Sequence, residues 1–442
     1  MKRLNFATLS ELVFDSDSEG ETPVVQQQDE HFAMLGEMDM VSAPKSIKAA
    51  YSSPEAPYWK EAIAEEMGSI QQNGVLTEPI QLPPGSQSTP TKMLFVKKLN
   101  SMGAVERYKA RLVYSYLWFR NQIDWGQIFA PVVDKVSIRF FWAVCASMGY
   151  SIMQLDIKTA FLYGDCLKEI YVTLAPELQT QEEKDQGLVR RMVKSLYGTP
   201  DAPRIWYSTL ASFLSTLGFS KCEREGCIFK NPLTGVIIMV YVDDLAVAGP
   251  SPEVVQSVVS QLEAQYSMRK MGTPTVFLGI NLQHFKHNKL IHISQSSYIR
   301  KLVEKYGLQM SHPKATPMPS TLSLEPLEEG EDLTQQPFRG LVGELLYISV
   351  CTRPDISFAV ATLSKFLDKA GDSHWNAAIQ VLLYLKGTLS YGIPLGGRSD
   401  ITDLKAYVDA DYANDKQDYR SVSGYLVFVG DSLISWMSNK DL

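Results

Sequence analysis

The stretch that most constrains this chain is VIIMVYVDDLAVAG, residues 236–249, in which seven apolar residues precede Asp243 and Asp244 and a second apolar run follows them. Short apolar runs rich in β-branched residues around a two-residue polar break predict a tight β-hairpin with a buried face. Two adjacent carboxylates repel each other, and burial increases this cost. A divalent cation would remove the cost, because hard oxygen ligands suit Mg2+. An exposed Asp-Asp turn is the alternative.

A second stretch, YSIMQLDIKTAFLYG at residues 150–164, places Asp156 at the end of an expected strand, before a helix-compatible segment. Phosphoryl transfer by two metal ions requires carboxylates from separate strands, because they bridge ions about 3.5–4 Å apart. Asp156 is therefore expected to complete a site with the hairpin pair; a cap or turn residue is the alternative. Adjacent strand residues point to opposite faces, so we expect Asp156 and Asp243 to be the principal ligands and Asp244 a weaker one.

Two further strands are expected at residues 92–99 and 107–113, joined by a turn. Alternation along the second strand places Arg107, Lys109 and Arg111 on one face. Three like charges on one strand face are unfavourable unless an anion binds there. A soluble, exposed strand edge is the alternative interpretation.

Four segments occur in a characteristic order: RYKARLV at 107–113, QLDIKTAFL at 154–162, YVDD at 241–244 and TRPDISFAV at 352–360. Together they resemble the reverse transcriptase of copia-type long-terminal-repeat retrotransposons, which is part of a Pol polyprotein. The resemblance begins near Pro44 and continues to the last residue. It implies an α+β fold: a right-hand polymerase with fingers, palm and thumb, then a helical connection and an incomplete ribonuclease H-like β segment.

The resemblance also implies a division of the chain. The expected parts are an acidic disordered leader at 1–43, fingers at 44–120, a palm with the catalytic carboxylates at 121–250, a thumb at 251–320, a linker with connection helices at 321–400 and a truncated ribonuclease H-like segment at 401–442. Asp409 matches the first metal ligand of a ribonuclease H domain. Few residues follow it, and such a domain needs acidic ligands from later elements, so we expect no ribonuclease H activity.

The function implied by the resemblance is RNA-directed DNA polymerisation. Asp156, Asp243 and Asp244 would hold two Mg2+ ions, with Mn2+ as a substitute. One ion would activate the primer 3′-hydroxyl, and the other would neutralise the triphosphate and the leaving pyrophosphate. The partners would be an RNA template, a DNA or RNA primer and deoxynucleoside triphosphates.

The remaining site residues are assigned by the same resemblance. Lys109 and Arg111 would bind the triphosphate, with Lys97 or Lys98 assisting. Phe161 would lie under the incoming sugar, where its bulk excludes a 2′-hydroxyl; a core phenylalanine is the alternative. Tyr197 and Gly198 belong to the segment SLYGTPDAPRIWY at 195–207, which matches a family segment near the nucleotide.

The sequence departs from the family pattern in three places. Bulky residues at 114–119 replace a small, a basic and a glycine residue, Thr199, Pro200 and Asp201 replace Leu, Lys and Gln, and Ile379, Gln380 and Leu383 stand where basic residues are usual. The formal net charge is also −7, whereas phosphate binding favours basic surface. The alternative function is therefore a catalytically silent, decayed retroelement remnant with at most nucleic-acid binding.

The chain carries no expected membrane segment. No apolar run approaches the ~18 residues of a membrane span, and the start has no sustained apolar core typical of a signal peptide. The five scattered cysteines are interpreted as reduced thiols. We expect no membrane association and a cytoplasmic location, within a virus-like particle by resemblance, with the nucleus as an alternative.

Overall fold

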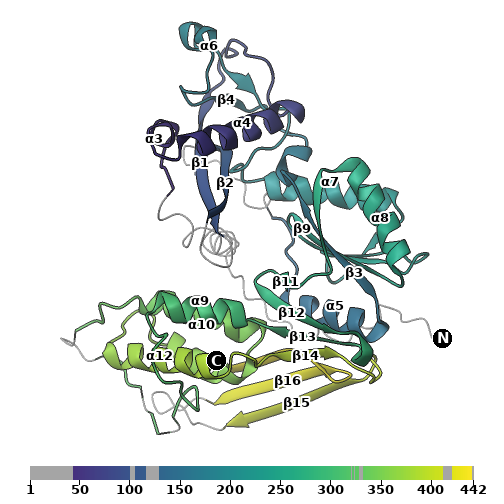
Figure 1. Cartoon of the computed structure of the whole chain (residues 1–442), viewed down its shortest axis with the longest axis vertical. Coiled ribbons are helices and arrows are strands. Elements are labelled where there is room, and N and C mark those ends of the chain that lie inside the picture. Colours follow the sequence, from purple (N-terminus) through teal and green to yellow (C-terminus); the bar gives the residue numbers. More distant parts are fainter. Residues whose placement is uncertain are drawn as a thin grey trace.

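The computed structural model describes residues 43–99, 105–115, 129–319, 321–322, 324–327, 332–411 and 421–440. Residues 1–42 of the acidic leader expected at 1–43, and the bulky residues 116–119, lie outside the described residues. Helices and strands are mixed throughout, and Figure 1 shows them arranged as an upper, a middle and a lower body. Within the described part, none of the helices combines the length and apolar character that a membrane crossing requires.

The upper body is a four-stranded sheet covered by a helix. The sheet order is β2-β1-β4-β5. Trp59 and Ile63 of the covering helix α4 pack against Phe95 and Leu112 of the sheet. Both strands predicted from the sequence, at 92–99 and 107–113, are confirmed. The elements are α3 (Ile47–Tyr51), α4 (Ala56–Gln72), β1 (Ser88–Leu99), β2 (Val105–Tyr114), β4 (Tyr171–Thr173), α6 (Gln181–Gln186) and β5 (Arg190–Arg191).

The middle body is a six-stranded sheet with the order β10-β3-β9-β8-β7-β6. Ile238 and Val240 pack with α7 and α8 on one face, while Ile237 and Met239 pack with α5 on the other. Both faces are buried, which explains the uninterrupted apolar runs. The elements are α5 (Lys135–Met148), β3 (Ser151–Ile157), α7 (Ala202–Thr216), β6 (Ser220–Lys221), β7 (Ile228–Lys230), β8 (Ile237–Tyr241), β9 (Asp244–Gly249), α8 (Pro252–Gln265) and β10 (Met268–Gly272).

Helix α5 joins the middle and lower bodies. Asp134 caps its N-terminus, where the side chain accepts a hydrogen bond from the Val136 amide at 2.7 Å. Gly149, with φ +66°, caps its C-terminus, and a left-handed glycine is a usual helix end. One side of α5 contacts the middle sheet, and another contacts apolar residues of the sheet β11-β12-β13-β14. That sheet comprises β11 (Val276–Phe277), β12 (Ile280–Phe285), β13 (Leu290–Ser294) and β14 (Ile393–Gly396).

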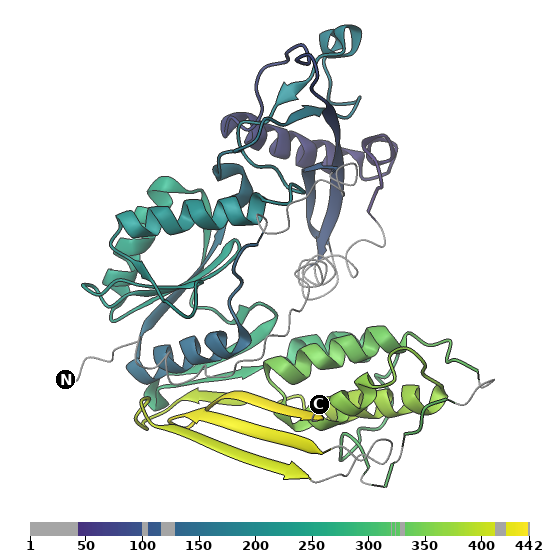
Figure 2. The ribbon, with the colours of Figure 1, turned by 180° about the vertical axis from the view of Figure 1, so that it is seen from behind.

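The lower body also contains four packed helices and a three-stranded antiparallel sheet. Figure 2 shows these three strands along the lower edge, beneath α5. Arg139 of α5 ties the parts together: its guanidinium donates to the Ile434 carbonyl at 2.6 Å and the Val350 carbonyl at 2.7 Å. The elements are α9 (Ser296–Lys305), α10 (Phe338–Cys351), α11 (Ser357–Ser364), α12 (Asp372–Gly387), β15 (Leu404–Asp411), β16 (Val422–Val429) and β17 (Ser432–Lys440).

Candidate active site

The predicted hairpin exists, but its turn lies one residue earlier than expected. Tyr241 pairs directly with Asp244, so the turn residues are Val242 and Asp243. Val242 has φ +56°, a backbone conformation that is rare for β-branched residues and costs about 1–3 kcal/mol. Two hydrogen bonds hold the turn. The Trp206 Nε1 donates to the Val242 carbonyl at 2.7 Å, and the Ile157 amide donates to the Asp243 carbonyl at 2.9 Å.

The three predicted carboxylates come together at this turn. Strand β3 pairs with β9 so that Asp156 lies directly opposite Asp244, and cross-strand partners share a face. Asp243 enters from the turn rather than from a strand. We expected Asp244 to be the weaker ligand because adjacent residues of one strand point to opposite faces. Asp243 lies in the turn and Asp244 in β9, so that reason does not apply to this pair.

Burial and mutual repulsion act on these carboxylates. Burial, followed by the charge of Asp156, raises the pKa of Asp243. The pKa of Asp244 rises to about 7, because of burial and then the charges of Asp243 and Asp156. A hydrogen bond from Gln154 opposes this rise. Burial and mutual repulsion therefore disfavour the charged forms of Asp243 and Asp244, and a bound hard cation would stabilise them.

The donor set fits Mg2+ in chemistry, since carboxylate oxygens are the ligands it prefers. Of the residues that the structure describes, however, no three His, Cys, Asp or Glu side chains are gathered closely enough to form a ready metal site. The three carboxylates therefore lie around one turn, but in the described residues their side chains are not gathered as a metal site.

The basic residues of β2 interact electrostatically with these carboxylates. In the β1–β2 ladder, Lys98 lies opposite Arg107 and Val96 lies opposite Lys109, so Arg107, Lys109 and Arg111 share one face as the alternation predicts. Burial and the neighbouring cations, Arg111 first, lower the pKa of Lys109 to about 8, while Asp156 acts in the opposite direction. The charges of Arg111 and Lys109 likewise lower the pKa of Asp243 against the stronger effect of burial.

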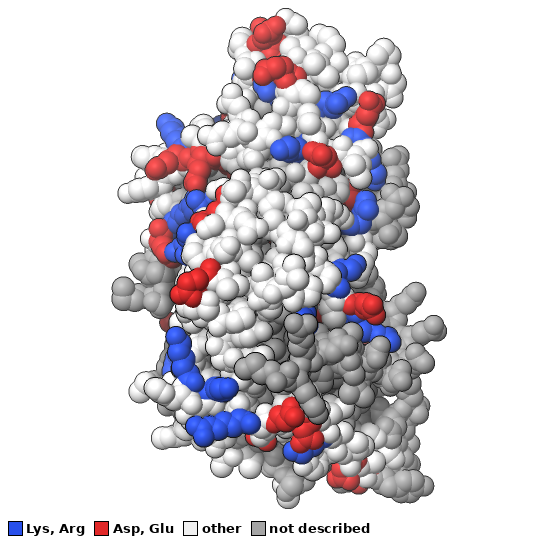
Figure 3. All heavy atoms as spheres, turned by 90° about the vertical axis from the view of Figure 1, so that its right-hand side faces the viewer, with Lys and Arg blue, Asp and Glu red and all other residues white. Residues whose placement is uncertain are grey.

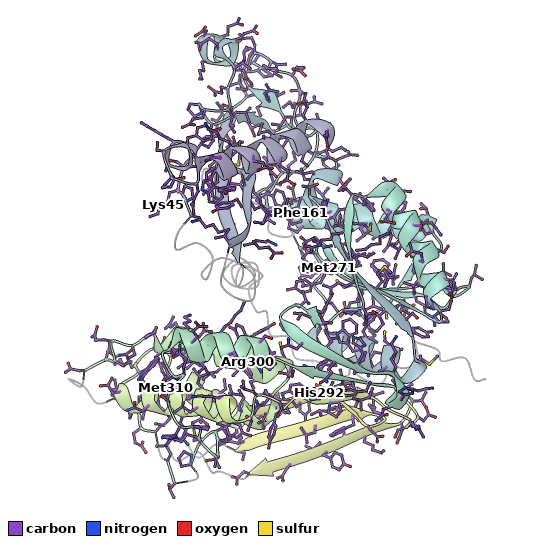
Figure 4. The ribbon with its side chains drawn as sticks, in the orientation of Figure 1. Lys45, Phe161, Met271, His292, Arg300 and Met310 are labelled. Carbon is purple, nitrogen blue, oxygen red and sulfur yellow. The ribbon has the colours of Figure 1, made fainter. Side chains whose placement is uncertain are left out.

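Arg111 is part of a row of three predicted site residues. Its guanidinium lies 5.0 Å from the centre of the Tyr197 ring, and that ring packs edge-on against Phe161 with a centroid separation of 5.2 Å. Figure 4 shows Phe161 where the upper body meets the middle sheet. The Nε of Arg111 is buried and has no hydrogen-bond partner among the described atoms. An unpaired buried donor is costly, and an anion would satisfy it.

Lys97 does not lie beside Arg111, Tyr197 and Phe161. It points to the opposite face of β1, where its Nζ lies 2.7 Å from the Glu55 carboxylate. Lys98 is the lysine that shares a face with Arg107 and Lys109. The two adjacent lysines therefore have different surroundings.

Gly198 allows the 195–207 segment to lie against β2. Its φ is +88°, and a Cβ at this position would come within 2.6 Å of the Tyr114 carbonyl oxygen. The Tyr114 amide donates to the Tyr197 carbonyl at 2.7 Å, which fixes Tyr197 beside Arg111. Tyr114 itself is buried, with its hydroxyl 3.1 Å from the Thr89 hydroxyl, so it packs in the core.

The other departures from the family pattern also have partners. Asp201 is buried at the start of α7 with its carboxylate 3.9 Å from the Lys168 Nζ. Leu383 is buried in α12, and the Gln380 amide donates to the Thr316 carbonyl at 3.3 Å. These side chains are absorbed by local packing, away from the carboxylate turn.

Three residues of the site were missed in the sequence. Gln154 lies two positions before Asp156 and therefore on the same strand face, a signal that was present. Trp206 lies in the segment 195–207, and no local pattern indicates its contact with the turn. Glu66 occupies a buried position of α4 and accepts a hydrogen bond from the Leu112 amide at 3.0 Å. Its spacing from Ile63 and Ile70 places it on the buried side, an unusual position for a carboxylate.

The face shown in Figure 3 carries interspersed basic and acidic side chains around a broad uncharged band. The coloured residues of this face form no continuous basic track, which is what a phosphate backbone attracts. On β2, by contrast, Arg107, Lys109 and Arg111 share one strand face.

Comparison with known proteins identifies the chain. Residues 76–320, more than half of the chain, match the family described as reverse transcriptase (RNA-dependent DNA polymerase). The retrovirus-related Pol polyprotein from transposon TNT 1-94 of Nicotiana tabacum is 34% identical over 89% of this chain and 30% of its own length. That from transposon RE1 of Arabidopsis thaliana is 34% identical over 90% of this chain and 27% of its own length. The chain thus spans less than a third of these relatives, and it belongs to the copia-type retrotransposon reverse transcriptases.

Proposed function

We propose that this chain is an RNA-directed DNA polymerase that extends a primer 3′-hydroxyl along an RNA template with deoxynucleoside triphosphates. The observation that carries the proposal is that Asp156 on β3 lies directly opposite Asp244, beside the turn that bears Asp243. The charges of Lys109 and Arg111 on β2 act on the same group. Membership of the reverse transcriptase family supports the same reaction class.

The residues divide into two groups in this proposal. Asp156, Asp243 and Asp244 would hold two Mg2+ ions, or Mn2+ in their place. The bound ions would supply activation of the primer hydroxyl and neutralisation of the triphosphate and pyrophosphate charge. Lys109 and Arg111 bind the triphosphate, and the unpaired Nε of Arg111 gives it a donor to offer.

Phe161 and Tyr197 belong to the nucleotide side of the site. Their edge-on contact and the position of Tyr197 over Arg111 set Phe161 beside the triphosphate-binding residues. Phe161 would then limit the space for a 2′-hydroxyl on the incoming sugar. Gly198 keeps this segment close to β2.

The bodies correspond to polymerase subdomains in the same proposal. The upper body would be the fingers and the six-stranded sheet with its helices the palm. The strands β11–β13 with α9 would be the thumb, and helices α10–α12 the connection. The sheet β15–β17 would be a ribonuclease H-like segment.

Primer extension by the purified chain tests the function. We expect extension on an RNA template with Mg2+ and none with chelator. Asp243→Asn and Asp156→Asn should each lower the rate by about a thousandfold or more, the scale at which catalytic groups act. Asp185→Asn is the matched control, because Asp185 is exposed in α6 and contacts only the Gln181 side chain among the described residues.

The alternative, a silent remnant, predicts a different result. A soluble and cooperatively unfolding protein that extends no primer under any of these conditions would contradict the polymerase proposal. Extension that survives both substitutions would contradict the assigned residues but not the reaction.

A further inference from the structure

We propose that Trp206 is a positioning residue that holds Val242 in its left-handed conformation and thereby fixes Asp243 for metal binding. The inference rests on the proposed function for its catalytic consequence. Its structural part, the control of the turn by the indole, stands independently of that function.

Trp206 is anchored so that its one donor meets one acceptor. Its side chain is 1% exposed and packs edge-on against Tyr266, with ring centroids 5.3 Å apart. The indole has a single N–H and no acceptor. That N–H donates to the Val242 carbonyl at 2.7 Å, so the contact orients the peptide group between Val242 and Asp243.

This peptide group follows Val242, the turn residue whose backbone conformation is unfavourable. Val242 has φ +56°, and its branched side chain disfavours that region. On the other side, the Asp243 carbonyl accepts from the Ile157 amide at 2.9 Å, one residue after Asp156. Asp243 is thus held between two hydrogen bonds, and the one from Trp206 opposes the relaxation of Val242.

A side-chain hydrogen bond to the carbonyl of a residue with positive φ occurs at a second place in the molecule. Leu278 is another described non-glycine residue with positive φ, at +49°. Its carbonyl accepts a hydrogen bond from the Tyr347 hydroxyl at 2.6 Å. In both cases a side chain from a packed helix binds the carbonyl of the strained residue, but only Val242 adjoins a site carboxylate. Tyr347→Phe is therefore a matched control for the loss of such a hydrogen bond.

Trp206→Phe tests the inference, because phenylalanine keeps an aromatic ring and lacks the N–H. We expect faster hydrogen exchange at the Ile157 amide and in residues 243–245. Mn2+ binding, followed by electron paramagnetic resonance, should weaken about tenfold, and kcat should fall about tenfold, which corresponds to about 1.4 kcal/mol. Tyr347→Phe should leave exchange at Ile157 and Mn2+ affinity unchanged.

Rescue separates positioning from packing. Glycine adopts positive φ without penalty, so Val242→Gly in the Trp206→Phe background should recover most of the Mn2+ affinity and of kcat. The inference would be overturned if Val242→Gly failed to restore Mn2+ affinity and kcat in the Trp206→Phe background. It would also be overturned if Trp206→Phe showed the same hydrogen exchange and Mn2+ affinity as the wild type. If Trp206→Phe does not fold, isosteric benzothienylalanine at position 206 removes the N–H without changing the ring shape, and the same readouts apply.

The two proposals fail differently. A wild-type chain that extends no primer contradicts the polymerase proposal, while exchange at Ile157 still reports on the turn. If the wild type is active and removal of the indole N–H does not change hydrogen exchange at Ile157, only the positioning role of Trp206 is contradicted.

Discussion

Lys109 is half-buried among other cations, and both conditions disfavour its charged form. The pKa of its ammonium is lowered to about 8, so the group is charged below pH 8 and neutral above it. A lysine at the usual pKa of about 10.4 would keep its charge throughout this range. In the proposed function, the charge that Lys109 offers to a triphosphate would therefore titrate near pH 8.

This gives a prediction for nucleotide affinity. Between pH 7 and pH 9 the dissociation constant of the incoming nucleotide, from single-turnover extension, should rise by up to about tenfold as the ammonium loses its proton. Lys109→Arg should remove the rise, because arginine stays charged. An equally steep rise in Lys109→Arg would show that another group is responsible.

Single residues were predicted unevenly by the sequence. Alternation predicts that Lys109 and Arg111 share a strand face, and the apolar pattern predicts that Asp156 ends a strand and that Asp243 and Asp244 lie at a hairpin. That the basic residues and the carboxylates belong to one site was implied only by the family resemblance. The orientation of Lys97 could not be predicted, because two adjacent lysines exchange faces with a one-residue change in phase. The strained conformation of Val242 could not either, since apolar pattern carries no information on φ and the contact that holds it comes from a distant helix.

Gly198 matters at the scale of elements, because it lets the 195–207 segment lie against strand β2. Gly198→Ala should destabilise the fold in two ways: by about 1–2 kcal/mol for positive φ, and further because the new Cβ would lie 2.6 Å from the Tyr114 carbonyl oxygen. Gly187→Ala is the control, with φ +62° and no heavy atom within 4 Å of the added Cβ. Denaturant unfolding should show a clearly larger loss for Gly198→Ala. Equal losses would contradict the close contact.

Elements with local signals were predicted well. The strands expected at 92–99 and 107–113 and the hairpin expected within 236–249 form as β1, β2 and the β8–β9 pair. Strand β14 was not predicted. It is four residues long and pairs with β13 from about a hundred residues earlier in the chain. Such pairing depends on tertiary contacts, which a local pattern does not encode.

At the scale of the whole molecule, Arg139 is a central contact between parts distant in sequence. Its guanidinium also lies 4.0 Å from the centre of the Trp436 ring, besides its bonds to β17 and to the end of α10. Burial lowers its pKa to about 10, which leaves it charged at neutral pH. The positive charge suits the carbonyls at a helix C-terminus.

Arg139→Met should therefore destabilise the folded chain by about 2–5 kcal/mol, because it leaves buried carbonyls without donors. Arg339→Met removes an exposed ion pair with Asp368 and should cost at most about 1 kcal/mol. Thermal unfolding of the two variants measures the difference. Similar melting temperatures would contradict the role of Arg139.

The pairing of β14 with β13, and the packing of both on α5, has a consequence during synthesis. Strands β11–β13 can cover part of the apolar side of α5 earlier, but the cluster is completed only after residues 393–434 have left the ribosome, because β14 and Ile434 belong to it. Until then the nascent chain carries a partly exposed apolar helix, a condition that favours chaperone capture or aggregation. Slow release of a soluble product and a requirement for chaperones during expression are the expected signs.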